Sequence, residues 1–463
     1  MTGNALRAAI VIAVAVAATV GLAGAFGPVL SRAQAQAQGP AQAAAAVAVA
    51  PREVGRVGDT PQYAAIVPAA RALAQPAPER IALGRRLFSD VRLSQPRGTS
   101  CASCHDPARA FTAFNGGRDG VAGGSIRGRL GTRNPPSLTY ARYLLPLYFY
   151  QDDDAQVPAP FGGLMLDGRA DSLAVQVREP LLSRHEMNLG TPRAAARRLR
   201  DSGYAQAFEA QFGAGVLDDP ERALRAFGSS LEAFLQSDEL SPFDSRFDAS
   251  LRGEQTLTPL ESKGLAIFRN PDQGNCASCH SVSATSSNPA RSLFTDFGYE
   301  ALGVPRNRKL PANARADAFD LGLCRTARAR HWPESDAWCG YFRTPSLRNV
   351  AVRERFMHNG VFTSLRDAVR FYATRSTRPA DWYGAHPVFD DLPATMRGNV
   401  NVVSTPLNRR AGATPALGED DIDAVVAFLG TLTDRRYADA PAAADAAGAP
   451  TPATDRRASM SRP

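Results

Sequence analysis

The sequence contains very little lysine, cysteine, histidine or tryptophan, and these scarcities narrow what the chain can do. Lysine occurs only at Lys263 and Lys309, so arginine supplies nearly all of the basic charge behind the net charge of +8. No basic run is interleaved with aromatic residues, which argues against nucleic-acid binding. Six cysteines in 463 residues are too few for a disulfide scaffold, yet they fall into three regular pairs. Each pair therefore needs its own explanation.

Long apolar runs are equally scarce, and the clearest one lies at the N-terminus. Ala8 to Leu30 is almost wholly apolar, Arg7 precedes it, and small residues between Ala33 and Ala37 offer a cleavage site. This pattern predicts an export signal over residues 1–37 and a periplasmic protein. The run of about 23 residues could also cross a bilayer core of roughly 30 Å, so an uncleaved N-terminal anchor is the alternative.

The remaining chain divides into a body and two low-complexity tracts. Residues 38–62 and 438–463 are rich in alanine and proline and cannot form a core, so we predict a flexible linker and a disordered tail. Two identical CASCH sequences split the body into similar halves, which predicts homologous domains at 63–252 and 253–437. Alternating strand patterns long enough for a large sheet are missing, so the predicted fold is mainly α with long loops.

Three helices have clear signals in the sequence. Asp219-Pro220 should open a helix that closes the first domain, because apolar residues then recur at three-to-four-residue spacing. Thr258 and Glu261 form a capping-box pattern that should open the second domain and lead towards Cys276. A third helix, with an apolar face over residues 422–432, should end that domain.

The two CASCH sequences carry the strongest chemical signal. CxxCH is the attachment motif of haem c, because two thiols three residues apart can each add to a haem vinyl group while the following imidazole binds the iron. A zinc site would require four clustered ligands, and a thioredoxin-like pair would require a βαβ context. We therefore predict two covalently bound haems c, each on a cytochrome c-like domain. The attaching and ligating residues are Cys101, Cys104 and His105, and Cys276, Cys279 and His280.

The third cysteine pair, Cys324 and Cys339, lies in a loop rich in glycine and arginine. Covalent haem attachment takes place outside the cytoplasm, where thiols are readily oxidised. The simplest prediction is therefore a structural disulfide between these two residues.

Longer segments around the motifs resemble the bacterial dihaem cytochrome c peroxidases and their relatives of the methylamine utilisation protein G type. The resemblance covers about Ile81 to Asp434. It is carried by LGRRLFSDVRLS before the first motif, LDGRADSLAVQVREPLLSRHEM in the middle, and RTPSLRNVAVRERFMHNGVFTSLRDAVRFY in the second half. It implies that the N-terminal haem reacts with hydrogen peroxide and that the C-terminal haem delivers electrons.

The resemblance also implies a distal pocket at the first haem, furnished by Gln176, Pro180 and Glu186. From the sequence, Leu173, Gln176 and Pro180 should share one stripe of a helix capped near residue 171 or 172, which would point Gln176 inward. Glu186 is the predicted general acid and base, which takes a proton from bound peroxide and returns one to the leaving oxygen. The alternative for Glu186 is a solvated loop carboxylate, and the adjacent His185 is expected to be an exposed neighbour.

The sixth ligand of the second haem is expected to be Tyr372, fourteen residues after His358. The peroxidases have methionine at this position, and tyrosine matches the methylamine utilisation protein G type. Tyr372 should lie on the inward face of a helix opened by Ser364, and a plain core tyrosine is the alternative. A phenolate ligand would favour oxidised states of the iron. If the helix register differs, the substitutes are Met187, Met357 and Met396.

The sequence departs from the family pattern at three places. Leu166 stands where many relatives have a tryptophan between the haems, which puts fast charge sharing in doubt unless another aromatic residue, Phe161 or one of Tyr140 to Tyr150, replaces it. No histidine lies between His105 and Leu166 to block the first haem, so no reductive activation is expected. Tyr140 replaces the usual asparagine of an interhaem calcium site, so calcium could bind only through carbonyl oxygens and is poorly supported.

These observations predict an oxidoreductase that reduces hydrogen peroxide with electrons from a small periplasmic cytochrome or cupredoxin. A second hypothesis is peroxide-driven oxidation of residues on a partner protein. The third, from another class, is a dihaem electron carrier without turnover.

Overall fold

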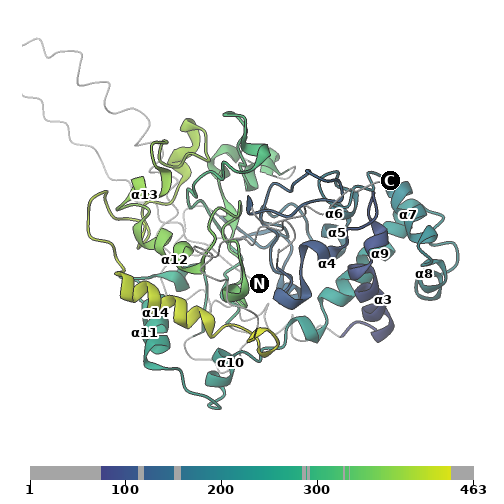
Figure 1. Cartoon of the computed structure of the whole chain (residues 1–463), viewed down its shortest axis with the longest axis horizontal. Coiled ribbons are helices and arrows are strands. Elements are labelled where there is room, and N and C mark those ends of the chain that lie inside the picture. The colour runs from purple at the N-terminus through teal and green to yellow at the C-terminus, as the bar shows by residue number, and fades with distance from the viewer. Residues whose placement is uncertain are drawn as a thin grey trace, which may run out of the picture. The chain divides into compact units, whose positions relative to one another are not determined.

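The computed structural model describes residues 75–112, 119–150, 158–283, 288, 292–326, 329–332 and 334–439. The predicted signal and linker, and nearly all of the predicted tail, lie outside these ranges. Helices are the main regular structure in the described part of the chain, and long loops join them (Figure 1). The first half contains α3 (Pro78–Ser89), α4 (Cys101–Cys104), α5 (Leu173–Gln176), α6 (Arg178–Leu182), α7 (Pro192–Asp201), α8 (Ala205–Phe212) and α9 (Pro220–Leu235). The second half contains α10 (Arg246–Leu251), α11 (Pro259–Arg269), α12 (Leu365–Thr374), α13 (Pro379–Tyr383) and α14 (Glu419–Gly430).

Strands are short. β1 (Tyr148–Tyr150) pairs antiparallel with β2 (Ala159–Phe161), and β3 (Tyr299–Glu300) pairs antiparallel with β4 (Phe342–Arg343). Each of these two pairs forms a two-stranded sheet, and the described ranges contain no larger sheet. The prediction of a mainly α fold is confirmed. None of the helices in these ranges is long and apolar enough to span a membrane.

The predicted helix starts are present. The Asp219 carboxylate accepts the backbone N–H groups of the first turn of α9. At α11, Glu261 accepts the Thr258 N–H at 2.7 Å, and the Thr258 hydroxyl accepts the Glu261 N–H at 3.3 Å, which completes the capping box. The prediction for α14 was too long, because the helix ends at Gly430, and Leu432 is buried just beyond it.

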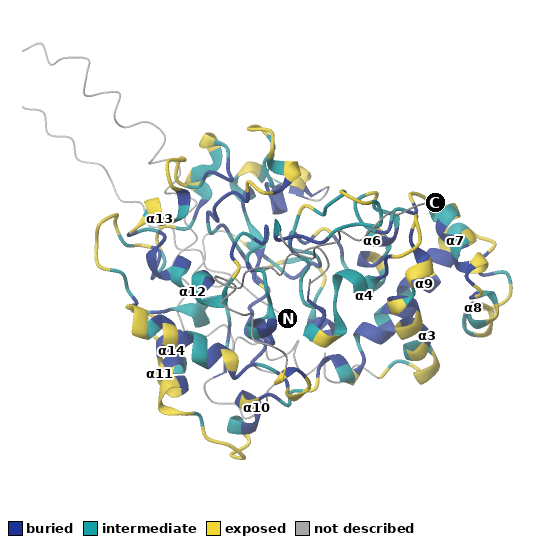
Figure 2. Ribbon diagram, viewed as in Figure 1, coloured by how far each residue is buried: buried dark blue, intermediate teal, exposed yellow. Residues whose placement is uncertain are grey.

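Each half has a hydrophobic core built around one close helix crossing. In the first half α3 crosses α9 so closely that a Cβ added at Gly84 would lie 2.0 Å from the Ser230 carbonyl oxygen. In the second half α11 crosses α14, and a Cβ at Gly264 would lie 2.0 Å from the Ala424 carbonyl oxygen. Figure 2 shows α11 and α14 with buried and exposed sides, as amphipathic helices over a core require.

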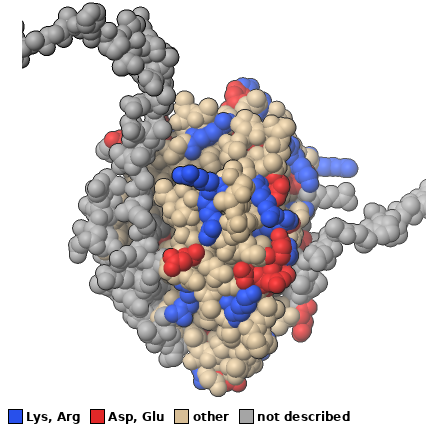
Figure 3. Space-filling model, turned by 90° about the vertical axis from the view of Figure 1, so that its left-hand side faces the viewer, with Lys and Arg blue, Asp and Glu red and all other residues tan. Residues whose placement is uncertain are grey.

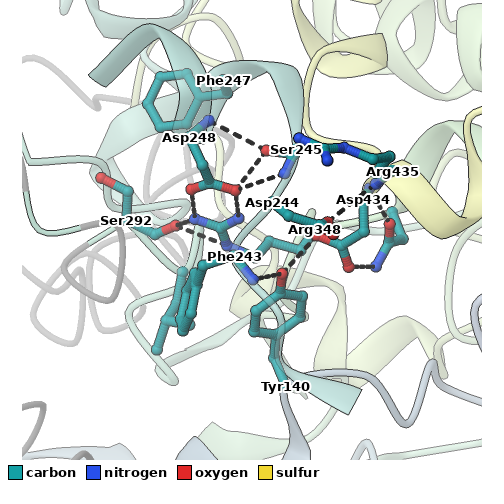
Figure 4. Close-up of polar contacts among 12 residues, drawn as sticks. Tyr140, Phe243, Asp244, Ser245, Phe247, Asp248, Ser292, Arg348, Asp434 and Arg435 are labelled. Carbon is teal, nitrogen blue, oxygen red and sulfur yellow. Dashed lines mark hydrogen bonds and ion pairs between the residues drawn. The ribbon is translucent and has the colours of Figure 1, made fainter. Parts of the chain in front are cut away.

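A buried ionic cluster joins elements from both halves (Figure 4). The Arg348 guanidinium is fully buried and donates to both Asp248 carboxylate oxygens at 2.8 and 2.9 Å, and to the Ser292 carbonyl oxygen. It lies 4.9 Å from the ring centre of Tyr140, which comes from the first half. The Tyr140 hydroxyl donates to the Asp434 carboxylate at 2.6 Å. The contacts between the halves are therefore partly charged, and these charges are paired.

The surface shows no single-sign field on the face drawn in Figure 3, where acidic and basic side chains are interspersed among other residues. Many surface arginines pair locally with carboxylates, as Arg366 does with Glu419 and Asp423. On this face, arginine side chains are therefore spread among acidic ones and do not gather in one basic patch.

Candidate haem sites

The first CASCH sequence forms one helical turn, α4. The Ser103 hydroxyl accepts the Ser100 N–H at 3.0 Å, which caps the turn, and the His105 N–H donates to the Cys101 carbonyl oxygen at 2.8 Å. Cys101 and Cys104 are half-buried cysteines. The turn therefore presents two thiols and an imidazole together, which is the arrangement that haem c attachment requires.

The second CASCH sequence has the same construction. Residues Cys276–Ser278 form a 3₁₀ turn, and the His280 N–H donates to the Cys276 carbonyl oxygen at 2.8 Å. Cys276 and Cys279 are also half-buried cysteines. The described ranges contain no group of three or more histidine, cysteine or acidic side chains arranged to hold a metal ion, so the four-ligand cluster of a zinc site is not found there.

Both histidines are oriented by a backbone carbonyl in the same way. His105 Nδ1 lies 3.1 Å from the Phe111 carbonyl oxygen, and His280 Nδ1 lies 2.9 Å from that of Phe294. Both phenylalanines have a φ of 54°, which turns the carbonyl towards the imidazole while the ring packs into the core. With its proton on Nδ1, each imidazole has its Nε2 lone pair free for iron.

Burial keeps these groups in the protonation states that the chemistry requires. It lowers the pKa of His105 to about 4 and also lowers that of His280, so both rings are neutral near pH 7. It raises the pKa of the Cys101 and Cys276 thiols to about 12. Neutral imidazoles and intact thiols fit haem c at both sites.

Arg353 gives a further indication of an anionic cofactor at the first site, because it is close enough to lower the pKa of His105. Its guanidinium donates to the backbone oxygens of Pro135 and Arg355. No ion pair with a carboxylate is found for it among the described residues, and burial lowers its pKa to about 10. A haem propionate would supply the missing negative charge.

Glu186 lies beside the first thiol pair, since its charge contributes to the raised pKa of Cys101. Burial raises the pKa of Glu186, and the nearby Glu179 acts in the same direction, while a hydrogen bond from Ser183 and the charge of Arg169 oppose the shift. The half-buried Glu186 can therefore hold a proton more readily than a solvated carboxylate does.

Gln176 is buried, as predicted, but the helix around it differs from the prediction. Leu173, Gln176 and Pro180 do not share one continuous helix, because the chain forms two short helices, α5 and α6, that meet at Val177. The cause is Pro180, which has no N–H to donate to the Gln176 carbonyl oxygen. Gln176 turns inward from α5, where Ser172 is the cap, and Pro180 is partly exposed on α6.

Tyr372 lies within electrostatic reach of the second thiol pair. Ser364 caps α12 as predicted, and the tyrosine side chain is partly buried on the last turn. Burial raises the pKa of Tyr372, and Cys279, Cys276 and Glu300 add to the shift.

Comparison with known proteins identifies the family to which the chain belongs. Residues 78–256 match the model of the di-haem cytochrome c peroxidase family. The chain is 41% identical to the methylamine utilization protein MauG of Paracoccus denitrificans over 81% of this chain and 94% of that protein. The chain belongs to the di-haem cytochrome c peroxidase family. It is therefore a peroxide-dependent oxidoreductase, and the resemblance found in the sequence is confirmed.

Other peroxidases are also similar to this chain. The cytochrome c551 peroxidase of Pseudomonas aeruginosa is 28% identical over 65% of this chain and 77% of its own length. The crystal structure of the diheme peroxidase BthA from Burkholderia thailandensis superposes with a TM-score of 0.76 at 55% identity, covering 80% of this chain and 89% of that one.

In this di-haem peroxidase, Leu166 is fixed between the two halves by backbone contacts. Its carbonyl oxygen accepts the Arg343 N–H at 2.8 Å. The neighbouring Asp167 pairs with Arg133 at 2.7 Å, and Arg133 also pairs with Asp320 of the second half at 2.6 and 2.7 Å. These long-range pairs had no sequence signal, because their members are far apart in the chain.

Several residues that the sequence left open lie elsewhere. Met187 is buried in the first core, Met357 packs against the second core, and Met396 packs against the cluster around the disulfide that joins Cys324 to Cys339. His185 is half-buried and not exposed as expected, and its Nδ1 has no hydrogen bond to the described residues. At the position of the expected calcium asparagine, the Tyr140 hydroxyl binds Asp434.

Proposed function

We propose that this di-haem peroxidase reduces hydrogen peroxide to water at a haem held by Cys101, Cys104 and His105, with Glu186 as the proton-transfer group. Electrons would reach it through a second haem, which Cys276, Cys279, His280 and Tyr372 would hold. The two haem domains would be residues 63–252 and 253–437, with α10 of the first range packed into the second core through Phe247.

The observation that carries this proposal is the position of Glu186. It is the half-buried carboxylate that lies within electrostatic reach of the first attachment cysteine, and its pKa is raised. The second site has a phenol, Tyr372, within electrostatic reach of its attachment cysteines. One site thus has a proton carrier and the other an additional ligand, which favours peroxide chemistry at the first and electron transfer at the second.

When bound, haem c supplies the iron at which the oxygen–oxygen bond of peroxide is cleaved. The side chains of this protein would position the peroxide and transfer its protons. Glu186 would accept a proton from one peroxide oxygen and donate it to the other, which then leaves as water. The buried Gln176 would orient the peroxide by its side-chain amide, and Pro180 would limit the space around it.

Replacing Glu186 with glutamine tests the proposal. We expect peroxide reduction to fall by about 100-fold or more, because the amide cannot relay a proton. The haem-loaded variant should keep its ferric absorption spectrum. Glu232→Gln is the matched control, since burial also raises the pKa of Glu232 but its carboxylate contacts the Ala174 N–H on α5. Equal rates for wild type and Glu186→Gln would contradict the assigned role.

Stopped-flow absorbance of the fully oxidised protein with one equivalent of hydrogen peroxide tests the order of events. We expect rapid Soret changes without prior reduction, because the sequence has no histidine between His105 and Leu166 that could block the first iron. A response only after half-reduction would show that another group blocks it.

A second candidate is peroxide-driven oxidation of a partner protein. The 41% identity to methylamine utilization protein MauG and the tyrosine at position 372 favour it. A tryptophan or tyrosine product on a co-purifying exported protein, formed only when peroxide and this enzyme are both present, would select this version over electron supply by a cytochrome or cupredoxin. Membership of a peroxidase family disfavours the plain electron carrier.

We further propose a periplasmic location, on the basis of the signal-like residues 1–37. Calcium forms no part of the proposal, because Tyr140 is occupied with Asp434 where the calcium-binding asparagine was expected.

A further inference from the structure

Met165 is an oxidisable side chain in contact with Gln176, a residue of the proposed peroxide site. Its thioether sulfur lies 3.5 Å from the Gln176 side-chain nitrogen, so the sulfur lies next to this site. Its side chain is only partly buried, and its backbone has a φ of 65°, which is unusual for a residue with a large side chain. Backbone strain of this kind persists only where the surroundings enforce it.

The surroundings of Met165 do enforce it. The Leu164 N–H donates to the Ala170 carbonyl oxygen at 2.8 Å, which closes a tight loop around Met165. Arg343 then fixes the loop from the second half, since its side-chain Nε donates to the Met165 carbonyl oxygen at 3.3 Å and its N–H donates to the Leu166 carbonyl oxygen at 2.8 Å. The sulfur is therefore presented to Gln176 by a fixed backbone.

The contact between Met165 and Gln176 pairs a strong hydrogen-bond donor with a weak acceptor. A primary amide N–H is a strong donor, whereas a thioether sulfur is a weak acceptor. A buried amide with such a partner is only weakly satisfied. A sulfoxide oxygen on the same sulfur would accept the Gln176 N–H well, so the pocket suits the oxidised product better than the thioether.

We infer that Met165 is a site of self-oxidation, at which one oxygen atom of hydrogen peroxide is transferred to the sulfur when no electron donor is present. This inference rests on the proposed function of the Glu186 pocket. In the net reaction the sulfur loses two electrons and gains the oxygen, peroxide gains two electrons, and the second peroxide oxygen leaves as water with both protons. No further oxidant or reductant is needed. The product draws Gln176 into a hydrogen bond and so removes it from peroxide binding.

The test is peptide mass spectrometry on the haem-loaded protein after successive additions of hydrogen peroxide without donor. We expect the mass of one added oxygen at Met165, while Met357 and Met396, which pack in the second half of the same molecule, serve as internal controls. Addition of a reducing dye as electron donor should suppress the modification, because turnover then consumes the peroxide. Glu186→Gln should suppress it as well, by about the factor through which peroxide reduction falls.

Met165→Leu supplies the second readout. Activity with donor, measured after each peroxide addition and compared with the initial rate of the same protein, should decline more slowly in this variant than in wild type. Normal peroxide reduction with an unmodified Met165 would overturn the inference and leave the proposed function intact. Equal oxidation of Met165 in wild type and Glu186→Gln would also overturn it, since bulk peroxide would then be the cause. Absence of both peroxide reduction and oxidation would reject the proposed function together with the inference.

Discussion

At the scale of single residues, Arg348 makes the most consequential buried interaction. Its side chain has no exposure and forms two parallel hydrogen bonds to Asp248, which is also fully buried. Ser292, whose carbonyl oxygen it also binds, lies two residues from Phe294, the carbonyl that orients His280. The Arg348 guanidinium therefore stabilises the segment from Ser292 to Phe294, which orients His280 at the second haem site.

Replacing Arg348 with methionine should lower the free energy of unfolding by about 3–5 kcal/mol, because a buried Asp248 loses its partner. The measurement is denaturant unfolding of the haem-loaded protein, followed by circular dichroism. Arg366→Met is the control, because Arg366 forms only exposed ion pairs with Glu419 and Asp423, and its loss should cost about 1 kcal/mol or less. Similar losses in both variants would show that Arg348 contributes no more than a surface ion pair.

Asp434 predicts a pH dependence of stability. Burial raises its pKa from 3.8 to about 6, although Arg348 and hydrogen bonds from Tyr140 and Asn349 oppose this, and Asp244 adds to it. The folded state thus retains a proton between about pH 4 and pH 6 that the unfolded state has lost. The stabilisation is complete below the unfolded pKa and is lost as pH rises through the folded pKa.

Asp434→Asn should remove this loss of stability with rising pH. Unfolding free energies measured from pH 4 to pH 7 should decline with pH more in wild type than in the variant, whatever constant difference the amide introduces. The comparison isolates one group, because carboxylates with lowered pKa values, such as Asp320, act in the opposite direction in both proteins. Parallel profiles would show that Asp434 is ionised throughout this range.

At the scale of elements, the two helix crossings depend on glycine. The absence of a side chain at Gly264 lets α11 approach α14 until backbone and backbone are nearly in contact. Gly264→Ala should therefore destabilise the protein by about 1–3 kcal/mol, since the added methyl forces the helices apart. Gly430→Ala, at the end of α14, is the control, because nothing lies within 4 Å of its added Cβ. Alanine there should be neutral or slightly stabilising. Thermal unfolding of both variants distinguishes these outcomes.

Helices were predictable from the sequence where local signals exist. Asp219, Thr258 and Ser364 cap the helices that their patterns predicted. The break between α5 and α6 could also have been predicted, because Pro180 removes the hydrogen bond to Gln176. The φ of 65° at Met165 could not, since methionine has no preference for that conformation and Arg343, which holds it, comes from a distant segment.

At the scale of the whole molecule, the sequence predicted two similar haem sites but not how the halves are joined. The haem motifs are local, and each needs only one turn of chain. The joining contacts are not: Arg133 and Asp320 are 187 residues apart, and Tyr140 and Asp434 are 294 apart. Charged residues are common on any surface, so no sequence pattern indicates which two will pair across a fold.

The Arg133–Asp320 pair should couple the two halves in unfolding. The guanidinium binds Asp320 through two nitrogens and also binds Asp167, next to Leu166, and it holds the pKa of Asp320 at about 2. Arg133→Gln and Asp320→Asn should each destabilise the holoprotein. The double variant should lose less unfolding free energy than the sum of the two single losses, by about 1 kcal/mol or more.

The two halves can also be followed separately during unfolding. Haem absorbance follows the surroundings of the haems, and circular dichroism follows the helices. Wild type should give coincident transitions, whereas Arg133→Gln should separate them, because the halves then retain fewer charged contacts. Strict additivity with coincident transitions in every variant would mean that the Arg133–Asp320 pair does not couple the halves.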